Sequence, residues 1–273
     1  MRAAVVGHVE WIEFGRVDHV PVPGEIVHVS EAWEEPGGGG AVAAVQMCKL
    51  AGAATLYTAL GDDEVGHRSK RALEQLGLRV EAVFRPEPQR RGYVHVDAAG
   101  ERTITVIGER LGPKGDDPLP WDELDETDAL YFTAGDVQAA RQARRAKTMV
   151  STTRGLDTLR EANVELDALV ASAKDPGERY AAGEIQPDPR HVVLTAGAKG
   201  GEYQAADGER GHWESTPLPG PVSDFYGCGD SFAAGLTHGL GAGLPIGEAL
   251  ALGARCGAAC ATGRGPYEGQ YRG

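Results

Sequence analysis

Short apolar segments alternate with longer amphipathic segments along most of this chain, and this alternation limits the folds that it can adopt. Residues Ala53–Leu60 form an apolar run of strand length, and the spacing of apolar residues predicts a helix from Asp63 to Gly77. Further strands are predicted at Ala129–Phe132, Thr148–Val150, Leu166–Ala171 and Val192–Thr195. Strands that alternate with helices in this way indicate an α/β fold, with a mostly parallel central sheet covered by helices.

Two regions depart from the alternation. Residues Gly24–Trp33 alternate between apolar and polar, and Gly92–Val96 and Thr103–Ile107 flank the turn sequence Asp97–Gly100. Such half-exposed strands do not fit beneath helices. We therefore expect a small β-sheet over one end of the main sheet, drawn from about residues 8–35 and 90–108, which serves as a lid, as a dimer surface, or as both.

Charge and hydropathy exclude several kinds of partner. The formal net charge is −13, and a nucleic-acid surface needs clustered Lys and Arg, so no nucleic-acid partner is expected. No apolar run approaches the roughly 18 residues of a membrane span, so no membrane partner is expected either. The first residues, Met1–Gly7, are typical of a first strand rather than of a secretory signal.

The four cysteines are few, as expected for reduced thiols, which predicts a cytoplasmic protein. Cys256 and Cys260 could share one face of a helix. Without a nearby His or further Cys they do not complete a zinc site, and small core residues are the better interpretation.

The segment Asp224–Gly235 carries the most chemical information. Gly227 and Gly229 lie where an irregular, proline-rich stretch gives way to the helix predicted over Ser231–Leu240. Glycines expose consecutive backbone N–H groups, and the first turn of a helix has unpaired donors and a partial positive charge. This combination predicts a phosphate site.

Asp230 stands within that segment, although a carboxylate repels a phosphate unless it has a task of its own. One such task is to remove the proton from a hydroxyl that attacks the phosphate. The alternative is that Asp230 only stabilises the first helical turn, by about 0.3–1 kcal/mol. On this segment alone both interpretations stay open.

The pattern Asp224-x-x-Gly227-x-Gly229-Asp230-x-Phe232-x-x-Gly235 resembles the C-terminal motif of the ribokinase-like (PfkB) carbohydrate kinase family. Three further segments resemble family motifs in the expected order, so that the resemblance spans nearly the whole chain. They are the N-terminal motif (Gly37-Gly38 and Thr58–Gly66), the lid hairpin (Asp97–Thr103) and the nucleotide-phosphate loop (Thr195–Gly201).

The resemblance implies a single ribokinase-like kinase domain over residues 1–273, a three-layer sandwich with a small β-sheet lid. It also implies ATP and Mg²⁺, and transfer of the γ-phosphoryl group to an alcohol of a sugar-like small molecule. The catalytic residues would be Asp230 as base, with Gly227, Cys228 and Gly229 forming the anion hole. The nucleotide-binding residues would be Thr195, Gly197, Gly200 and Asp224, with Ser172 and Asp175 in place of the family's Asn and Glu, and Asp175 acting on magnesium through water.

The acceptor side departs from the family pattern. Ile12 stands where sugar-binding members have an acid, and Val42 stands where they have an Asn. Neither side chain forms hydrogen bonds, although Glu10 or Glu13, which flank Ile12, could replace the acid by a shift in register. With Gly38 and Gly39 these residues would line the acceptor site, and we expect an acceptor that is less hydroxylated than ribose or partly apolar.

Two other functions remain open from the sequence. Residues 38–43 fit the G-x-G-x-x-A pattern of NAD(P)-dependent oxidoreductases, with Asp62 or Asp63 about twenty residues later. Alternatively, the altered acceptor positions and the Ser172/Asp175 departure indicate a non-catalytic nucleotide- or metabolite-binding member of the kinase fold. Retention of Asp230 argues against the second alternative.

Overall fold

A large, mostly parallel sheet forms the centre of the molecule in the computed structural model, which describes residues 1–175 and 177–273. Its nine strands lie in the order β13-β12-β11-β10-β9-β8-β1-β4-β5. From β11 to β5 all neighbours are parallel, and β12 and β13 extend the edge antiparallel. The strands are β1 (Ala3–Val6), β4 (Thr55–Gly61), β5 (Arg79–Arg85), β8 (Ala129–Phe132), β9 (Thr148–Thr152), β10 (Ala168–Ser172), β11 (His191–Thr195), β12 (Gly201–Ala205) and β13 (Arg210–Trp213).

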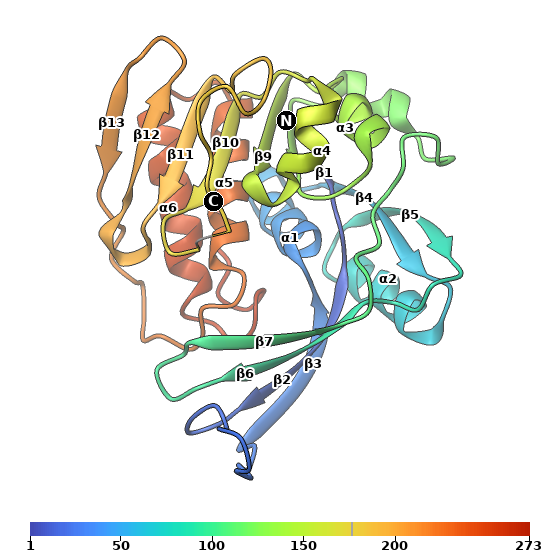
Figure 1. Cartoon of the computed structure of the whole chain (residues 1–273), viewed down its shortest axis with the longest axis vertical. Coiled ribbons are helices and arrows are strands. Elements are labelled where there is room, and N and C mark those ends of the chain that lie inside the picture. The colour runs from blue at the N-terminus through green and yellow to red at the C-terminus, as the bar shows by residue number, and fades with distance from the viewer. Residues whose placement is uncertain (176) are drawn as a thin grey trace.

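Helices cover both faces of this sheet (Figure 1). Successive side chains of a strand point to opposite faces, so Ala3 and Val5 join one hydrophobic core while Ala4 and Val6 join the other. The predicted three-layer α/β fold is therefore confirmed. One layer holds α1 (Gly39–Ala51), α2 (Glu64–Gln75), α5 (Cys228–Gly241) and α6 (Ile246–Cys260); the other holds α3 (Val137–Ala143) and α4 (Leu156–Ala162), with short 3₁₀ turns η1 (Trp121–Glu126), η2 (Thr153–Gly155) and η3 (Gly197–Lys199) between elements.

The helix predicted from Asp63 to Gly77 is α2. Asp63 caps its N-terminus, since the carboxylate accepts a hydrogen bond from the Gly66 amide at 2.8 Å. Leu73 packs into the core, and Gly77, in the left-handed conformation (φ 94°), ends the helix. Local sequence chemistry is sufficient to set both ends of this element.

A second sheet projects from one end of the main sheet (Figure 1). Its four strands lie in the order β3-β2-β6-β7 and are β2 (Glu10–Arg16), β3 (Glu31–Gly37), β6 (Arg91–Val96) and β7 (Arg102–Ile107). Asp97 forms the predicted turn between β6 and β7, because its carboxylate accepts hydrogen bonds from the amides of Ala99 and Glu101 at 2.9 Å each.

The strand predicted over Gly24–Trp33 is wrong in its position, since the strand formed is β3, which begins at Glu31. Pairing between β2 and β3 extends only from Glu10–Gly37 to Arg16–Glu31. Beyond Arg16 the chain turns away, and Glu25 closes a separate turn by accepting a hydrogen bond from the Val22 amide at 3.0 Å. Residues 24–30 alternate as a strand does but lack a strand to pair with.

Within residues 1–175 and 177–273, no helix is both long enough and apolar enough to cross a membrane.

Candidate active site

The loop before α5 is held in place by the buried carboxylate of Asp224. One oxygen accepts a hydrogen bond from the Tyr226 amide at 3.0 Å and the other from the Gly265 amide at 2.8 Å. The Tyr226 hydroxyl in turn accepts a hydrogen bond from the Gly38 amide at 3.0 Å. Asp224 is fully buried, and its carboxylate stabilises this loop. From the sequence, Asp224 was predicted to bind the nucleotide.

The same loop presents backbone amides at the start of a helix. Gly227 adopts the left-handed conformation (φ 80°), and α5 begins at the next residue, Cys228. The first amides of a helix have no intrahelical acceptor, so those of Cys228 and Gly229 are available to an anion. A side chain on Gly229 would contact nothing within 4 Å. Free amides and open space at Gly229 are features that the predicted anion hole requires, and its role stays a prediction.

Asp230 lies in the first turn of α5, half-buried and beside the glycine run that begins α1. Its Oδ1 is 2.8 Å from the position that a Cβ on Gly39 would occupy. Burial raises the pKa of Asp230 to about 6, against the positive charges of Arg154 and Arg102, which lower it. A carboxylate with this pKa is ionised at neutral pH and accepts a proton more readily than an ordinary Asp.

Two polar side chains, His8 and Glu10, face the same glycines. A Cβ on Gly38 (φ 85°) would lie 3.1 Å from His8 Cδ2 and 3.2 Å from Glu10 Cγ, so only glycine fits there. Glu10 Oε1 forms an ion pair with Arg90 Nε at 2.7 Å. Burial, together with nearby arginines, lowers the pKa of His8 to about 3, so the ring is neutral. Its Nδ1 is buried without a hydrogen-bond partner among the described residues.

Ile12 and Val42, the two apolar acceptor positions, are fully buried. Ile12 lies on β2, where its side chain fills the space left by the missing side chains of Gly37 and Gly92. Val42 lies on α1 beneath Gly227. Both side chains support the backbone around the site, and the polar groups that face it come from His8 and Glu10.

Two loops at the carboxyl ends of β10 and β11 lie together near Asp230. The methylene and amine ends of Lys174 are 3.2 Å from the position of a Cβ on Gly197, which joins the Ser172–Asp175 loop to the Thr195–Gly200 loop. The Thr195 hydroxyl donates a hydrogen bond to the Ala171 carbonyl at 3.1 Å. Gly200 (φ 76°) has no room for a side chain, because a Cβ would overlap the Trp213 carbonyl.

Arg154 links these loops to Asp230. It follows β9 in the turn η2, and its guanidinium pairs with Asp175 at 2.8 Å and with Glu178 at 2.6 Å. Its positive charge acts on Asp230 and on His8. Arg154 is therefore paired with the loop that carries Asp175 and also acts electrostatically on the predicted base.

Sequence reasoning missed His8, Arg90, Arg110, Arg154 and Glu178. A signal for two of them existed: His8 follows β1 and Arg154 follows β9, and ligand-binding residues of parallel sheets gather at the carboxyl ends of the strands. Arg90 and Arg110 flank the hairpin β6–β7. Nothing in their local sequence relates them to Asp230, which lies more than a hundred residues further along the chain.

The glycine run does not support a dinucleotide site. Residues 38–40 connect β3 of the small sheet to α1, whereas the oxidoreductase pattern requires a turn directly after the first strand of the parallel sheet. Cys256 and Cys260 are buried free thiols, as interpreted from the sequence. The part of the chain described contains no group of three or more His, Cys, Asp or Glu side chains that could hold a metal ion by themselves.

Comparison with known proteins gives a consistent result. A family model described as "pfkB family carbohydrate kinase" matches residues 2–270. The chain is 27% identical over 262 residues to an ATP-dependent ribose-1-phosphate kinase of Halopiger xanaduensis, covering 86% of this chain and 83% of that protein.

Among solved structures, the fold is similar to the ribokinase of Thermotoga maritima, with a TM-score of 0.78, 20% identity and coverage of 99% of this chain and 96% of that one. It is also similar to the ribokinase of Cryptococcus neoformans var. grubii in complex with ADP, with a TM-score of 0.77, 22% identity and coverage of 99% and 97%. At these identities the likeness supports the fold.

Proposed function

The chain belongs to the pfkB family of carbohydrate kinases and is an ATP-dependent sugar kinase, and we propose that Asp230 is the base that activates the acceptor hydroxyl. The observation that carries this assignment is the position of Asp230, half-buried beside free amides at the start of α5 and against Gly39. A carboxylate at a phosphate site needs a task that offsets the repulsion, and proton transfer from the acceptor is such a task.

In the proposed reaction the acceptor hydroxyl lies between Asp230 and the γ-phosphate of ATP. Asp230 accepts the hydroxyl proton as the oxygen attacks phosphorus, and ADP leaves with the electron pair of the broken bond. The amides of Gly227, Cys228 and Gly229 donate hydrogen bonds to the transferring group, where charge stabilisation has its largest effect.

We assign the nucleotide phosphates to the two loops that meet at Lys174 and Gly197. Magnesium that accompanies ATP is held mainly by phosphate oxygens and water, with one or two protein carboxylates. Asp175, with Glu178 beside it on Arg154, fits that requirement. These carboxylates would hold Mg²⁺, whose positive charge offsets that of the phosphates.

We propose that the acceptor is a pentose that already carries a phosphate. His8 and Glu10 face Gly38, and Glu10 pairs with Arg90. Arg154 acts electrostatically on Asp230, so the surroundings of the predicted base are polar or charged. This lining favours an anionic sugar over the partly apolar acceptor expected from Ile12 and Val42. The relative from Halopiger xanaduensis is a ribose-1-phosphate kinase, which supports the same class of acceptor.

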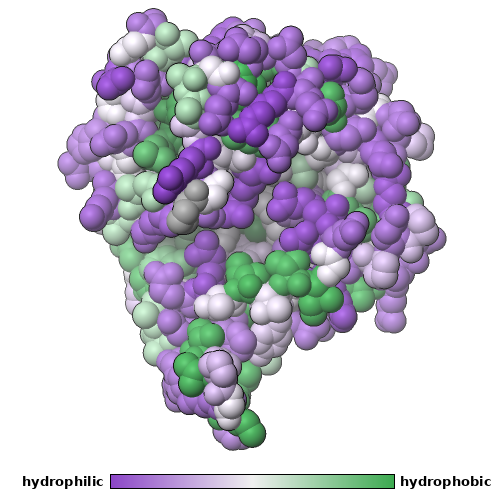
Figure 2. Space-filling view, viewed as in Figure 1, coloured by the Kyte–Doolittle hydropathy of each residue, from purple (hydrophilic) through white to green (hydrophobic). Residues whose placement is uncertain are grey.

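The small sheet is proposed to act both as a lid and as a dimer surface. Every residue of β7 is exposed, including Ile104, Val106 and Ile107, and Figure 2 shows hydrophobic side chains gathered over this part of the molecule. An exposed apolar edge strand favours pairing with a second copy of the chain. Sedimentation analysis tests the dimer, which would dissociate on substitution of Ile104 by Lys.

We propose that the enzyme is cytoplasmic, because its cysteines are free thiols.

Release of ADP, measured over free pentoses, hexoses, nucleosides and pentose monophosphates, tests the proposed acceptor class. The Asp230→Asn variant tests the base: it should bind ATP as the wild type does and lose roughly 10²–10⁴ in kcat. Turnover within a few fold of wild type would remove Asp230 from the mechanism. Tight binding of ATP and sugars without ADP release by the wild type would instead support a non-catalytic member of the fold.

A further inference from the structure

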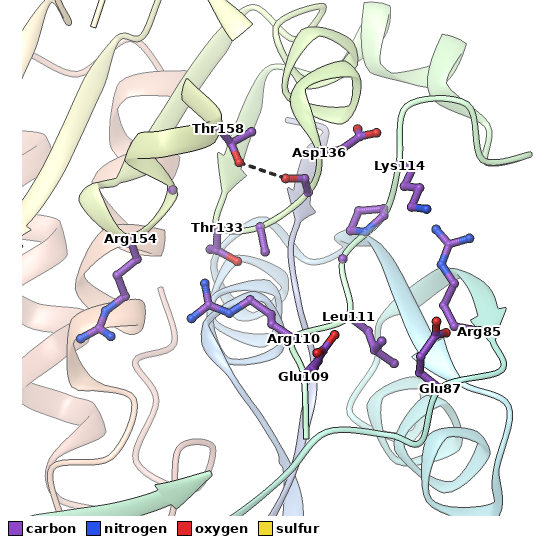
Figure 3. A pocket seen from close by; sticks show the side chains of 15 residues that line it. Arg85, Glu87, Glu109, Arg110, Leu111, Lys114, Thr133, Asp136, Arg154 and Thr158 are labelled. Carbon is purple, nitrogen blue, oxygen red and sulfur yellow. Dashed lines mark hydrogen bonds between the residues drawn. The ribbon is translucent and has the colours of Figure 1, made fainter. Parts of the chain in front are cut away.

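A cavity of about 380 Å³ opens at the carboxyl ends of β8 and β9. Its walls come from the segment after β7 (residues 109–114), from the carboxyl end of β8 and from the turn after β9. In Figure 3 the side chains of Arg110 and Arg154 extend toward the same end of this cavity, near Thr133. Thr133 lies against Gly7, and Gly7 lies against Gly40 at the start of α1, next to the Gly39 that adjoins Asp230. That end of the cavity is therefore near the predicted base, on which Arg154 also acts electrostatically.

Arg110 has no carboxylate partner among the described residues. Its neighbour Arg90 is paired with Glu10 at 2.7 Å. Since the charges of that pair cancel, Arg110 leaves this group of three side chains with a net positive charge. Burial and the charge of Arg90 both lower the pKa of Arg110. Glu10 acts on the charge of Arg110 from a distance but is itself paired with Arg90. A guanidinium without a direct carboxylate partner gains from an external anion.

Another arginine of the same cavity is occupied. Arg85 Nη2 contacts both oxygens of Asp117, at 2.8 and 2.7 Å, on the opposite side of the cavity. Figure 3 places Glu87 on the Arg85 side as well. Asp136, which also lines the cavity, accepts hydrogen bonds from the amides of Ala139 and Gly115. Glu109 and Lys114 also line the cavity, Glu109 next to Arg110 and Lys114 on the Arg85 side. The guanidinium groups at the Arg110 end are those of Arg110 and Arg154.

Arg154 has carboxylate partners, but they belong to the nucleotide side. Asp175 and Glu178 hold its guanidinium in the absence of ligands. When Mg²⁺ and ATP engage these carboxylates, the positive charge of Arg154 becomes available to a second anion. Arg154 thus reaches the cavity and the nucleotide loop together.

We infer that Arg110 and Arg154 bind the phosphate already present on the acceptor, with that phosphate in the cavity and the acceptor hydroxyl at Asp230. This assignment rests on the proposed function, because it requires Asp230 to mark the reacting end of the acceptor. A phosphate dianion takes two hydrogen bonds from each planar guanidinium, which neutral sugars cannot do. His8 and Glu10 remain on the other side to contact sugar hydroxyls.

The test is the ratio of kcat/KM for pentose monophosphates to kcat/KM for the matching free pentoses. Arg110→Gln should lower that ratio roughly 10²-fold, mainly through KM for the phosphorylated acceptor, with KM for ATP unchanged. Arg110→Lys keeps the charge but loses the paired hydrogen bonds, so its ratio should lie between that of the wild type and that of Arg110→Gln. Arg154→Gln should lower the ratio too and raise KM for ATP.

Two controls separate this effect from a change of net charge or of folding. Arg71→Gln removes one exposed charge from the outer part of α2, and Arg85→Gln removes the arginine that is already paired; both should keep the wild-type ratio. Thermal unfolding checks that each variant is folded. Inorganic phosphate should compete with the phosphorylated acceptor in the wild type and lose that effect in Arg110→Gln.

The two possible failures are distinguishable. A wild-type enzyme that phosphorylates nothing, or an Asp230→Asn variant that retains full turnover, would overturn the proposed function. If the wild type is active and Asp230→Asn is inactive, but Arg110→Gln keeps the wild-type ratio, the subsite assignment is wrong while the function stands. A wild type that prefers free pentoses would also overturn the subsite.

Discussion

Asp230 and Gly39 are in contact across the site, with Oδ1 of the carboxylate 2.8 Å from the position that a Cβ on Gly39 would occupy. The two residues come from the first turns of α5 and α1, which pack against each other behind the sheet. The absence of a side chain at Gly39 therefore allows the carboxylate its position. The glycine at position 39 leaves room for the carboxylate of the predicted base.

Gly39→Ala tests this relationship directly. The added methyl group displaces the Asp230 carboxylate by a few tenths of an ångström or more, so kcat should fall roughly 10- to 100-fold while KM for ATP stays near wild type. Steady-state kinetics with saturating ATP measures the effect. Gly247→Ala on α6 is the matched control, because nothing lies within 4 Å of its added Cβ. Equal kcat in the two variants would contradict the argument.

The pH profile should report the ionisation of Asp230. Its pKa of about 6 means that kcat/KM is constant above pH 7 and falls tenfold per pH unit well below pH 6, because only the carboxylate accepts a proton. His8, with a pKa of about 3, stays neutral over this range and adds no inflection. Arg154→Gln removes a charge that favours the ionised form, so the inflection should move to higher pH. A profile that is flat to pH 4.5 would exclude this assignment.

Most helices and strands were predictable from the sequence because local chemistry determines them. Asp63 and Gly77 bound α2, and Asp97 forms its turn from its own neighbours. The position of β3 was not predictable, since alternation indicates a strand without naming the strand that pairs with it.

The arginines were not predictable for a related reason. Arg90, Arg110 and Arg154 reach one site only because β6, β7 and β9 are placed around it by the topology of two sheets. The family motif led to the prediction of Asp230 as base, with the glycines before it. On the acceptor side, where this chain departs from the motif, the neighbouring residues could be identified only from the three-dimensional structure.

Replacing Asp230 should also change stability, in a direction that depends on pH. The pKa of Asp230 is raised from 3.8 to about 6 in the folded protein. Above pH 6 the carboxylate is therefore ionised in both states, and its charge is less stable in the folded state than in the unfolded state. Asp230→Asn should therefore be more stable than wild type at pH 7.5, by up to about 3 kcal/mol. The difference should shrink as pH falls from 6 and vanish below about 4.

Urea unfolding at several pH values measures this difference. Asp157→Asn is the control, since the Asp157 side chain is 97% exposed and its loss should change the free energy of unfolding by less than about 0.5 kcal/mol at any pH. Equal stability of wild type and Asp230→Asn at pH 7.5 would show that the carboxylate is better solvated than its surroundings indicate.

Asp224→Ala should unfold more easily than wild type, because the amides of Tyr226 and Gly265 lose their acceptor inside the protein. A buried donor left without a partner costs about 1–3 kcal/mol, which gives roughly 2–6 kcal/mol for the two, reduced by the relief of a buried charge. Asp207→Ala removes a comparable hydrogen bond, to the Glu209 amide, in an exposed turn and should cost less than about 1 kcal/mol. Urea unfolding of the three proteins measures the contrast.

Since Tyr226 also accepts a hydrogen bond from Gly38, loosening this loop should lower kcat as well. A variant that kept both wild-type stability and wild-type kcat would return Asp224 to the nucleotide-binding role that the family motif suggested.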